Sequence, residues 1–224
     1  MSVWLLMIMR RVAGKTVNLR LQSADNTSFG GWFVFSDPFY RELSYPPPQN
    51  QDGVFPRKEL IPSALKSAPT ILFLHGNTGT RAHPLRTVLY TAFTSRLKAN
   101  VFAIDYRGYG DSEGHPTVHG VSKDAKAAWD YLMSQGAKPE DVLILGHSLG
   151  TAIAGLLAAE LGREGIHPRG TVLMSVSDFK DLRNSLPSRI LSAFFISTKA
   201  DRSILSLWVP PTAQATLGDT PCSS

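Results

Sequence analysis

The chain has 224 residues, a length that suits one domain or one domain with an extended end. Hydrophobic residues make up 43% of it, which is enough for a sizeable core and excludes disorder by composition. The 23 Lys and Arg residues are scattered among 18 Asp and Glu residues without forming a stripe, so we expect no nucleic-acid partner. The single cysteine, Cys222, excludes an internal disulfide and a CxxC metal site.

Residues 1–16 form an apolar and basic N-terminal segment, in which MSVWLLMIM precedes Arg10 and Arg11. A secretory signal has the reverse order, with its positive charge ahead of the apolar run. The run is also shorter than the roughly 18 apolar residues of a membrane-spanning helix. We expect this segment to pack on the domain or to be a disordered end. The alternative is a shallow anchor on a membrane surface, so the predicted location is cytoplasmic or peripheral to a membrane.

The next segments predict an antiparallel hairpin followed by a loop. Residues 17–22 alternate between apolar and polar, which indicates a strand. Turn residues follow, and W-F-V-F at 32–35 supplies the partner strand. Residues 36–68 are rich in proline and polar residues, which predicts a loop because proline cannot donate to a strand ladder.

From residue 70 onward, short apolar strands alternate with helices. Strands are predicted at 70–74, 100–104, 142–145 and 170–174, and helices at 86–97, 116–136 and 151–161. This alternation predicts an α/β fold with a mostly parallel sheet and helices on both faces. We expect the core to span residues 17–175. Residues 176–224 are expected to be an atypical tail, because its final stretch is low in charge and rich in Pro, Thr and Ser.

The sequence G-H-S-L-G at 146–150 joins a predicted strand directly to a predicted helix. This is the G-x-S-x-G motif in its strand–turn–helix context. So tight a turn strains the φ and ψ angles of the serine, and the flanking glycines remove clashes with neighbouring backbone. The motif predicts Ser148 as a nucleophile and the backbone N–H of Leu149 as a donor to a tetrahedral oxyanion. The alternative is a glycine-rich structural turn.

An oxyanion hole needs a second donor, which normally comes from the loop after an earlier strand. Here H-G-N follows the predicted strand 70–74. Gly76 allows the backbone to approach a substrate closely, and the N–H of Asn77 is the candidate donor. We expect His75 to be a packed histidine that shapes this loop rather than a catalytic base.

Three stretches, HGNTGTR at 75–81, IDYRGYGDSEG at 104–114 and LGHSLGTAIA at 145–154, carry a family resemblance. Their order and spacing resemble the α/β-hydrolase-domain serine hydrolases that cleave monoacylglycerols and lysophospholipids, and also the serine-aminopeptidase-like relatives. The resemblance spans about residues 17–174. It implies the α/β-hydrolase fold and cleavage of acyl esters, most readily of lipids, through an acyl-enzyme. A Ser-His-Asp triad of this kind needs no metal or organic cofactor.

Two further expectations concern the reaction and the loop after the second parallel strand. No cluster of acids is present to hold a substrate amine, which favours a lipid ester over an aminopeptidase substrate. The family's counterpart of Asp105–Gly108 is structural and lines the site, so we expect an ion pair between Asp105 and Arg107 that holds this loop.

The chain departs from the family after Ser148, where the triad order requires an acid and then a histidine. The sole histidine in that part is His167, which precedes the strand at 170–174 and is therefore expected at the opposite edge of the sheet. Asp178, Asp181 and Asp201 stay open as the acid. The resemblance thus implies that the last strands are missing and that the chain is truncated at its C-terminus.

We expect this chain to be a weak or inactive catalyst, and whether it acts as an enzyme stays open. One explanation is a truncated or mis-spliced product of a serine hydrolase gene. A second is a genuine short form with a non-catalytic binding or regulatory role. A third is a chain whose site is completed by a histidine of a partner.

Overall fold

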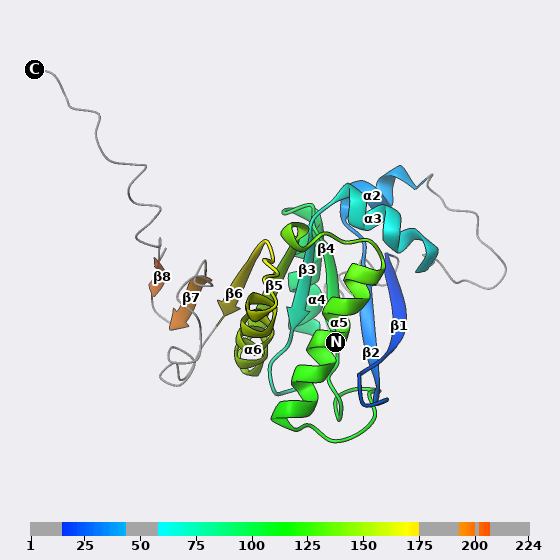
Figure 1. The fold of residues 1–224 in the computed structure, drawn as a ribbon. Coiled ribbons are helices and arrows are strands. Elements are labelled where there is room, and N and C mark those ends of the chain that lie inside the picture. Colours follow the sequence, from blue (N-terminus) through cyan, green and yellow to red (C-terminus); the bar gives the residue numbers. More distant parts are fainter. Residues whose placement is uncertain (1–14, 44–57, 175–192, 200–201, 207–224) are drawn as a thin grey trace, which may run out of the picture.

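The computed structural model describes residues 15–43, 58–174, 193–199 and 202–206. Their strands form one eight-stranded sheet in the order β1-β2-β4-β3-β5-β6-β7-β8 (Figure 1). The strands are β1 (Thr16–Gln22), β2 (Ser28–Val34), β3 (Thr70–Leu74), β4 (Asn100–Ile104), β5 (Val142–His147), β6 (Gly170–Met174), β7 (Ala193–Lys199) and β8 (Arg202–Ser206). The α-helices are α2 (Asp37–Glu42), α3 (Ile61–Ser67), α4 (Pro84–Ser95), α5 (Val118–Ser134) and α6 (Leu149–Arg163), with 3-10 turns at Lys58–Leu60 and Pro139–Asp141.

The predicted fold class is confirmed. β1 pairs antiparallel with β2, and β2 pairs antiparallel with β4. The neighbours β4, β3, β5, β6 and β7 then run parallel. This is an N-terminal antiparallel hairpin on a mostly parallel sheet, as the alternation of apolar runs and helices predicts.

Helices cover both faces of the sheet, with α5 and α6 in front of it and α4 behind it in Figure 1. Successive side chains of a strand point to opposite faces. Leu72 and Leu74 of β3 therefore join the hydrophobic core with α5 and α6. Ile71 and Phe73 join a second core, into which Tyr90 of α4 packs. Because both faces of β3 are buried, its sequence is continuously apolar.

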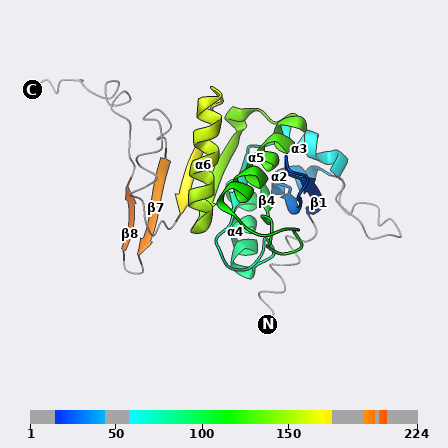
Figure 2. The same cartoon turned by 60° about the horizontal axis from the view of Figure 1, so that its bottom comes forward.

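The parallel strands place the functional loops at one edge of the sheet. β3 lies between β4 and β5, and all three run in the same direction. The loops that leave their carboxyl ends therefore meet at the edge that Figure 2 brings forward. Substrates of open α/β sheets bind at this carboxyl edge.

The prediction of a loop over residues 36–68 is wrong in two places. Helix α2 and helix α3 lie within this stretch, and each has proline at one of its first two helical positions. Proline is tolerated there because the first N–H groups of a helix have no intrahelical partner. Phe39 in α2 and Ile61 in α3 are buried and supply the energy that holds the two short helices.

Two strands extend the sheet beyond β6, within the stretch assigned to the atypical tail. β7 pairs parallel with β6, and β8 pairs antiparallel with β7. Phe194, Phe195 and Ile196 of β7 are aromatic or β-branched, and these residue types favour strands. The composition of the tail as a whole masks this short run. The sheet therefore does not end with residues 170–174.

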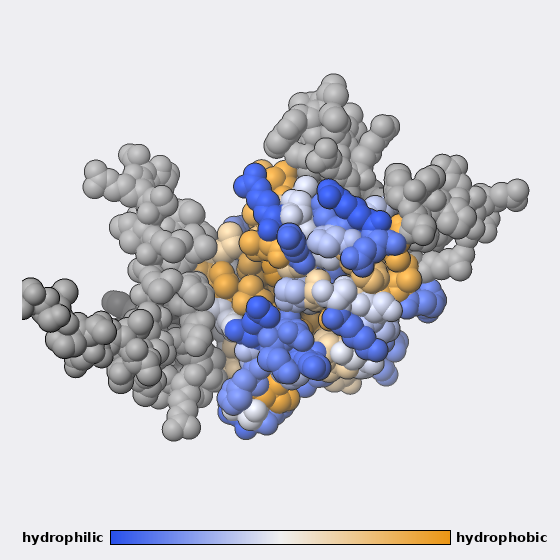
Figure 3. Space-filling model, turned by 90° about the horizontal axis from the view of Figure 1, so that it is seen from above, coloured by the Kyte–Doolittle hydropathy of each residue, from blue (hydrophilic) through white to orange (hydrophobic). Residues whose placement is uncertain are grey.

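One face of the molecule has a hydrophobic centre. When the molecule is viewed from above relative to Figure 1, hydrophobic residues gather in the middle of this face between hydrophilic areas (Figure 3). Among the described residues, none of the helices combines the length and apolar character needed to cross a membrane.

Candidate active site

Ser148 occupies the turn between β5 and α6 and has φ 52° and ψ −118°. A residue with a side chain rarely adopts positive φ, and such strain is concentrated at functional sites. The carbonyl of Ser148 accepts hydrogen bonds from the backbone N–H of Thr151 at 2.9 Å and from its hydroxyl at 2.6 Å. The Ser148 N–H donates to the carbonyl of Met174 at 3.0 Å. These contacts hold the turn while the side chain of Ser148 stays exposed.

Close packing of the turn explains both glycines of the motif. A Cβ on Gly146 would lie 2.3 Å from the carbonyl oxygen of Gly150. A Cβ on Gly150 would lie 2.0 Å from the carbonyl oxygen of Leu74, at the end of β3. Both neighbours are backbone atoms that cannot move aside, so only glycine fits at either position.

The loop after β3 lies against the serine turn. A Cβ on Gly76 would stand 3.0 Å from the Cβ of Ser148 and 3.2 Å from Nδ1 of His147. Asn77 follows Gly76 directly, and Leu149 follows Ser148 as the first residue of α6. The structure thus brings together the two segments that carry the predicted nucleophile and the two predicted oxyanion donors.

Asn77 and Leu149 both lie at the surface. The side-chain oxygen of Asn77 accepts a hydrogen bond from the hydroxyl of Tyr109 at 2.6 Å, so the loop after β4 supports the loop after β3. The N–H groups of the first turn of α6 have no intrahelical acceptor, and the helix dipole adds positive potential there. This end of α6 is therefore suited to a developing negative charge beside Ser148.

His75 is fully buried, as expected for a packed histidine that shapes this loop. Its Nδ1 lies 2.7 Å from the Gly76 carbonyl oxygen, and its ring packs 4.4 Å from the ring of Tyr106. Its Nε2 is 3.2 Å from a carboxylate oxygen of Asp105 but is not aligned for a hydrogen bond. His75 therefore braces the loop from inside the protein.

The predicted ion pair between Asp105 and Arg107 is wrong. Asp105 pairs with Arg81, whose guanidinium lies 2.6 Å away. Arg107 instead pairs with Asp124 of α5 at 2.8 Å and with Asp25 of the β1–β2 turn at 2.9 Å. Asp105 still continues the line of β4, whereas the chain begins to turn at Arg107 and carries that side chain toward α5. The two side chains thus meet different partners.

Arg86 of α4 contributes to the site and was missed by the sequence analysis. Its guanidinium donates to carbonyl groups of the loop after β3. Burial lowers the pKa of His147, and the electrostatic effects of Arg86 and His75 lower it further. An arginine in a predicted helix gives no signal of this role, because the loop it contacts lies earlier in the chain.

Among the described residues, none forms a hydrogen bond with the hydroxyl of Ser148. His167 precedes β6, whose first residue Gly170 pairs with Leu143 near the start of β5. Ser148 lies beside Met174 at the other end of β6. His167 therefore lies at the opposite edge of the sheet, as the sequence predicts. The acid candidates Asp178, Asp181 and Asp201 lie outside the described residues.

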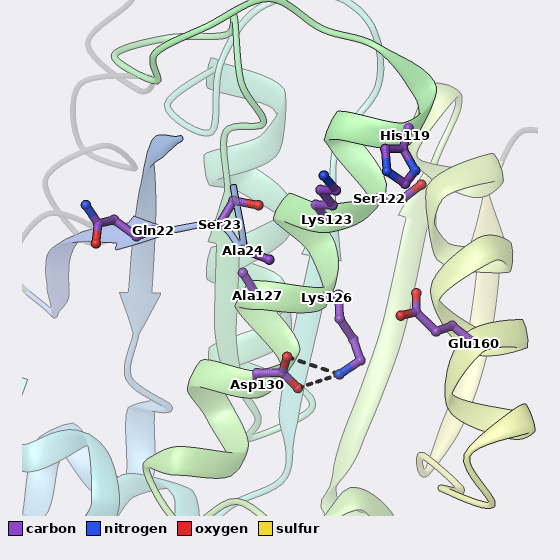
Figure 4. Close-up of a pocket in the computed structure, with 10 residues that line it drawn as sticks. All are labelled: Gln22, Ser23, Ala24, His119, Ser122, Lys123, Lys126, Ala127, Asp130 and Glu160. Atoms are coloured by element: carbon purple, nitrogen blue, oxygen red, sulfur yellow. Dashed lines mark hydrogen bonds and ion pairs between the residues drawn. The ribbon is translucent and has the colours of Figure 1, made fainter. Parts of the chain in front are cut away.

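A cavity of about 510 Å³ lies between α5, α6 and the end of β1 (Figure 4). Two of its lysines are already paired: Lys123 with Asp25 at 3.3 Å and Lys126 with Asp130 at 2.8 Å. The cavity contains neither the serine turn nor the loop after β3. In the described part of the chain, no three His, Cys, Asp or Glu side chains cluster in a way that would hold a metal ion.

The strand order, with a strained serine between β5 and α6 and a glycine loop against it, defines the class of α/β hydrolases. The alpha/beta hydrolase family matches residues 71–221, and the chain belongs to this family. It is 34% identical over 180 residues to lysophosphatidylserine lipase ABHD12 of Danio rerio, covering 80% of this chain and 44% of that protein. It is 43% identical over 138 residues to the alpha/beta hydrolase domain-containing protein WAV2 of Arabidopsis thaliana, covering 61% of this chain and 36% of that protein. The chain thus spans less than half the length of these relatives.

Solved structures confirm the fold. An alpha-beta hydrolase from Vibrio vulnificus superposes with a TM-score of 0.57 at 20% identity, over 79% of this chain and 51% of that one. The Pyrococcus furiosus esterase Pf2001 superposes with a TM-score of 0.54 at 20% identity, over 77% of this chain and 55% of that one. At such identities the likeness concerns the fold.

Proposed function

We propose that the chain carries the nucleophile of a serine hydrolase that cleaves acyl esters of lipids, with Ser148 as the nucleophile. The observation that carries this proposal is the strained, exposed Ser148 between β5 and α6, faced by Gly76 of the loop after β3. The family and the lipase relatives make a lipid ester the favoured substrate. The name of these lipases, lysophosphatidylserine lipase, favours a lysophospholipid over a monoacylglycerol, and both substrates stay within the proposal.

The reaction would proceed in two steps. The Ser148 oxygen attacks the ester carbonyl carbon, its proton passes to the leaving alcohol, and an acyl-Ser148 ester forms. Water then attacks this ester, which releases the fatty acid and restores the hydroxyl. In both steps the N–H groups of Asn77 and Leu149 would stabilise the oxyanion, and one such donor is worth roughly 10²–10³ in kcat.

Proton transfer is the weak step in this chain. Ser148 has no hydrogen-bonded base among the described residues, and His167 lies at the other edge of the sheet. Loss of the base lowers kcat on the order of 10⁴- to 10⁶-fold in other serine hydrolases. We therefore propose low turnover by the 224-residue chain. The same observation favours a second candidate, a non-catalytic binding or regulatory form.

A fluorophosphonate probe separates the two candidates, because it reacts with activated serines. The full chain, Ser148→Ala and the control Ser134→Ala, which changes an exposed serine of α5, are incubated with the probe. Slow labelling that disappears only in Ser148→Ala supports the hydrolase. Labelling that persists in Ser148→Ala removes Ser148 from its role, and an unlabelled chain favours the non-catalytic form. Fatty acid release from lysophosphatidylserine, lysophosphatidylcholine and a monoacylglycerol then ranks the substrates.

A further inference from the structure

Arg86 occupies a place that is electrostatically unfavourable for a cation. It lies in the first turn of α4 and is 6% exposed. The positive end of a helix dipole opposes a cation there, and burial of a charge is costly unless it is paired. Among the described residues, Arg86 forms no ion pair with a carboxylate. Its position therefore needs a compensating interaction.

Backbone carbonyl groups of one loop provide that interaction. The guanidinium of Arg86 donates to Thr80 at 2.6 Å, to Thr78 at 2.5 Å and to Gly76 at 3.1 Å. These three carbonyls alternate along the loop that leaves β3. One buried side chain thus fixes the direction of three peptide groups beside the serine turn.

The Gly76 carbonyl matters most, because it belongs to the same peptide group as the Asn77 N–H. In a planar trans peptide the C=O and the N–H point in opposite directions. Arg86 and Nδ1 of His75, at 2.7 Å, both hold the carbonyl oxygen. The Asn77 N–H is therefore fixed on the side away from Arg86. We call the hydrogen bonds from Arg86 to this loop the clamp. Without the clamp, the loop could rotate its peptide groups freely, because it contains Gly76 and Gly79, and Gly79 has φ +72°.

We propose that Arg86 is a positioning residue of this site: by holding the Gly76 carbonyl, it aims the Asn77 N–H at the oxyanion that forms on attack by Ser148. The inference rests on the proposed hydrolase function and adds to it a residue outside the motif. Arg86 is also close to the serine turn, where it adds to burial in lowering the pKa of His147. A purely structural role for Arg86 would stabilise the loop without changing the reaction.

The test compares Arg86→Gln and Arg86→Lys with Arg96→Gln, which makes the same change at the exposed end of the same helix. Rates of fluorophosphonate labelling and of p-nitrophenyl ester hydrolysis are measured in folded, full-length protein. For Arg86→Gln we expect kcat to fall roughly 10²-fold, as for a lost oxyanion donor, with KM changed less than about threefold. Arg86→Lys keeps the positive charge but lacks the several N–H donors of the planar guanidinium, so its kcat should lie between those of Arg86→Gln and the wild type. Arg96→Gln should match the wild type.

Hydrogen–deuterium exchange of residues 76–80 supplies a readout that does not depend on activity. Faster exchange in Arg86→Gln, confined to this loop and partly restored in Arg86→Lys, supports the clamp. Unchanged exchange, or an unchanged labelling rate in a folded Arg86→Gln, overturns the role of Arg86. A wild-type chain that neither labels nor hydrolyses would contradict the proposed function instead. If Arg86→Gln fails to fold, the test rests on Arg86→Lys. A labelling rate and a hydrogen–deuterium exchange rate that both equal those of the wild type in Arg86→Lys would then overturn the proposal.

Discussion

The carboxylate of Asp124 accepts hydrogen bonds from both the backbone N–H and the guanidinium of Arg107, at 2.9 Å and 2.8 Å. Asp124 belongs to α5 and is fully buried, whereas Arg107 lies in the loop after β4. The same guanidinium reaches Asp25 in the β1–β2 turn. Arg107 therefore ties helix α5, the β1–β2 hairpin and the loop after β4 together.

We expect Asp124→Asn to lower the free energy of unfolding by up to about 3–5 kcal/mol, because it removes the fully buried one of the two carboxylates that pair with Arg107 and leaves only the partly exposed Asp25. Asp130→Asn on the same helix is the control. Asp130 is exposed and pairs with Lys126 four residues earlier, so its loss should cost under about 0.5 kcal/mol. Urea unfolding measures both variants. Equal losses in the two would show that the Arg107–Asp124 pair adds nothing to stability.

Gly150→Ala tests the steric basis of the serine turn. The new Cβ would lie 2.0 Å from the Leu74 carbonyl oxygen, so β3 and α6 would have to separate. We expect a loss of at least about 3 kcal/mol, at the top of the range for overpacking, or failure to fold. Gly136→Ala provides the comparison, since φ +90° strains an alanine but no atom lies within 4 Å. Gly136→Ala should lower the free energy of unfolding by about 1–2 kcal/mol. Thermal unfolding measures both variants. A loss of stability in Gly150→Ala no larger than that in Gly136→Ala would contradict the predicted clash with Leu74.

Asp111 makes stability depend on pH through its pair with Arg81 at 2.6 Å. The hydrogen bond from Arg81 lowers the pKa of Asp111 below its ordinary value. A depressed carboxyl pKa stabilises the fold above the unfolded value of about 3.9, and this contribution is lost as the pH falls through the folded pKa. Asp111 is half exposed, so the pair contributes about 1 kcal/mol or less at pH 7.

Asp111→Asn should therefore be less stable than the wild type at pH 7, and the difference should shrink as the pH falls below 4. Urea unfolding between pH 7 and pH 2.5 measures it. Asp141→Asn serves as a control, because Asp141 lies 3.8 Å from the exposed Arg169 in a weaker surface pair. A difference between wild type and Asp111→Asn that stays constant over this range would exclude the ionised carboxylate as its source.

The sequence predicts β3 and β4 well because both faces of these two strands are buried. Predicted bounds for β3, β4 and β6 match the structure residue for residue, and the match is best explained for β3 and β4, which are nearly continuous apolar runs. The motif at 146–150 likewise places Ser148 in the turn where the structure has it. Local patterns are sufficient for such features.

Features that depend on residues distant in the chain were not predictable in this way. Arg107 has its partners 82 and 17 residues away, at Asp25 and Asp124, whereas the prediction from the family's loop paired it with the nearby Asp105. Arg86 acts on a loop that precedes its own helix, and its position contradicts the usual preference of helix N-termini for acidic residues. Helices α2 and α3 were missed because their prolines indicate a loop until their first-turn position is known.

His167 is the histidine that chain order would select as the base, since it follows Ser148. The register of β5 and β6 places it at the amino edge, about 16 Å of strand away from Ser148. We therefore expect His167→Ala to leave the fluorophosphonate labelling rate within about twofold of the wild type, because a general base must lie within hydrogen-bonding reach of its nucleophile. His75→Ala, in contrast, should lower the rate, because it removes one of the two groups that hold the Gly76 carbonyl. Thermal unfolding of both variants separates a change in the site from loss of folded protein, and a strong decrease in His167→Ala alone would mean that His167 reaches Ser148.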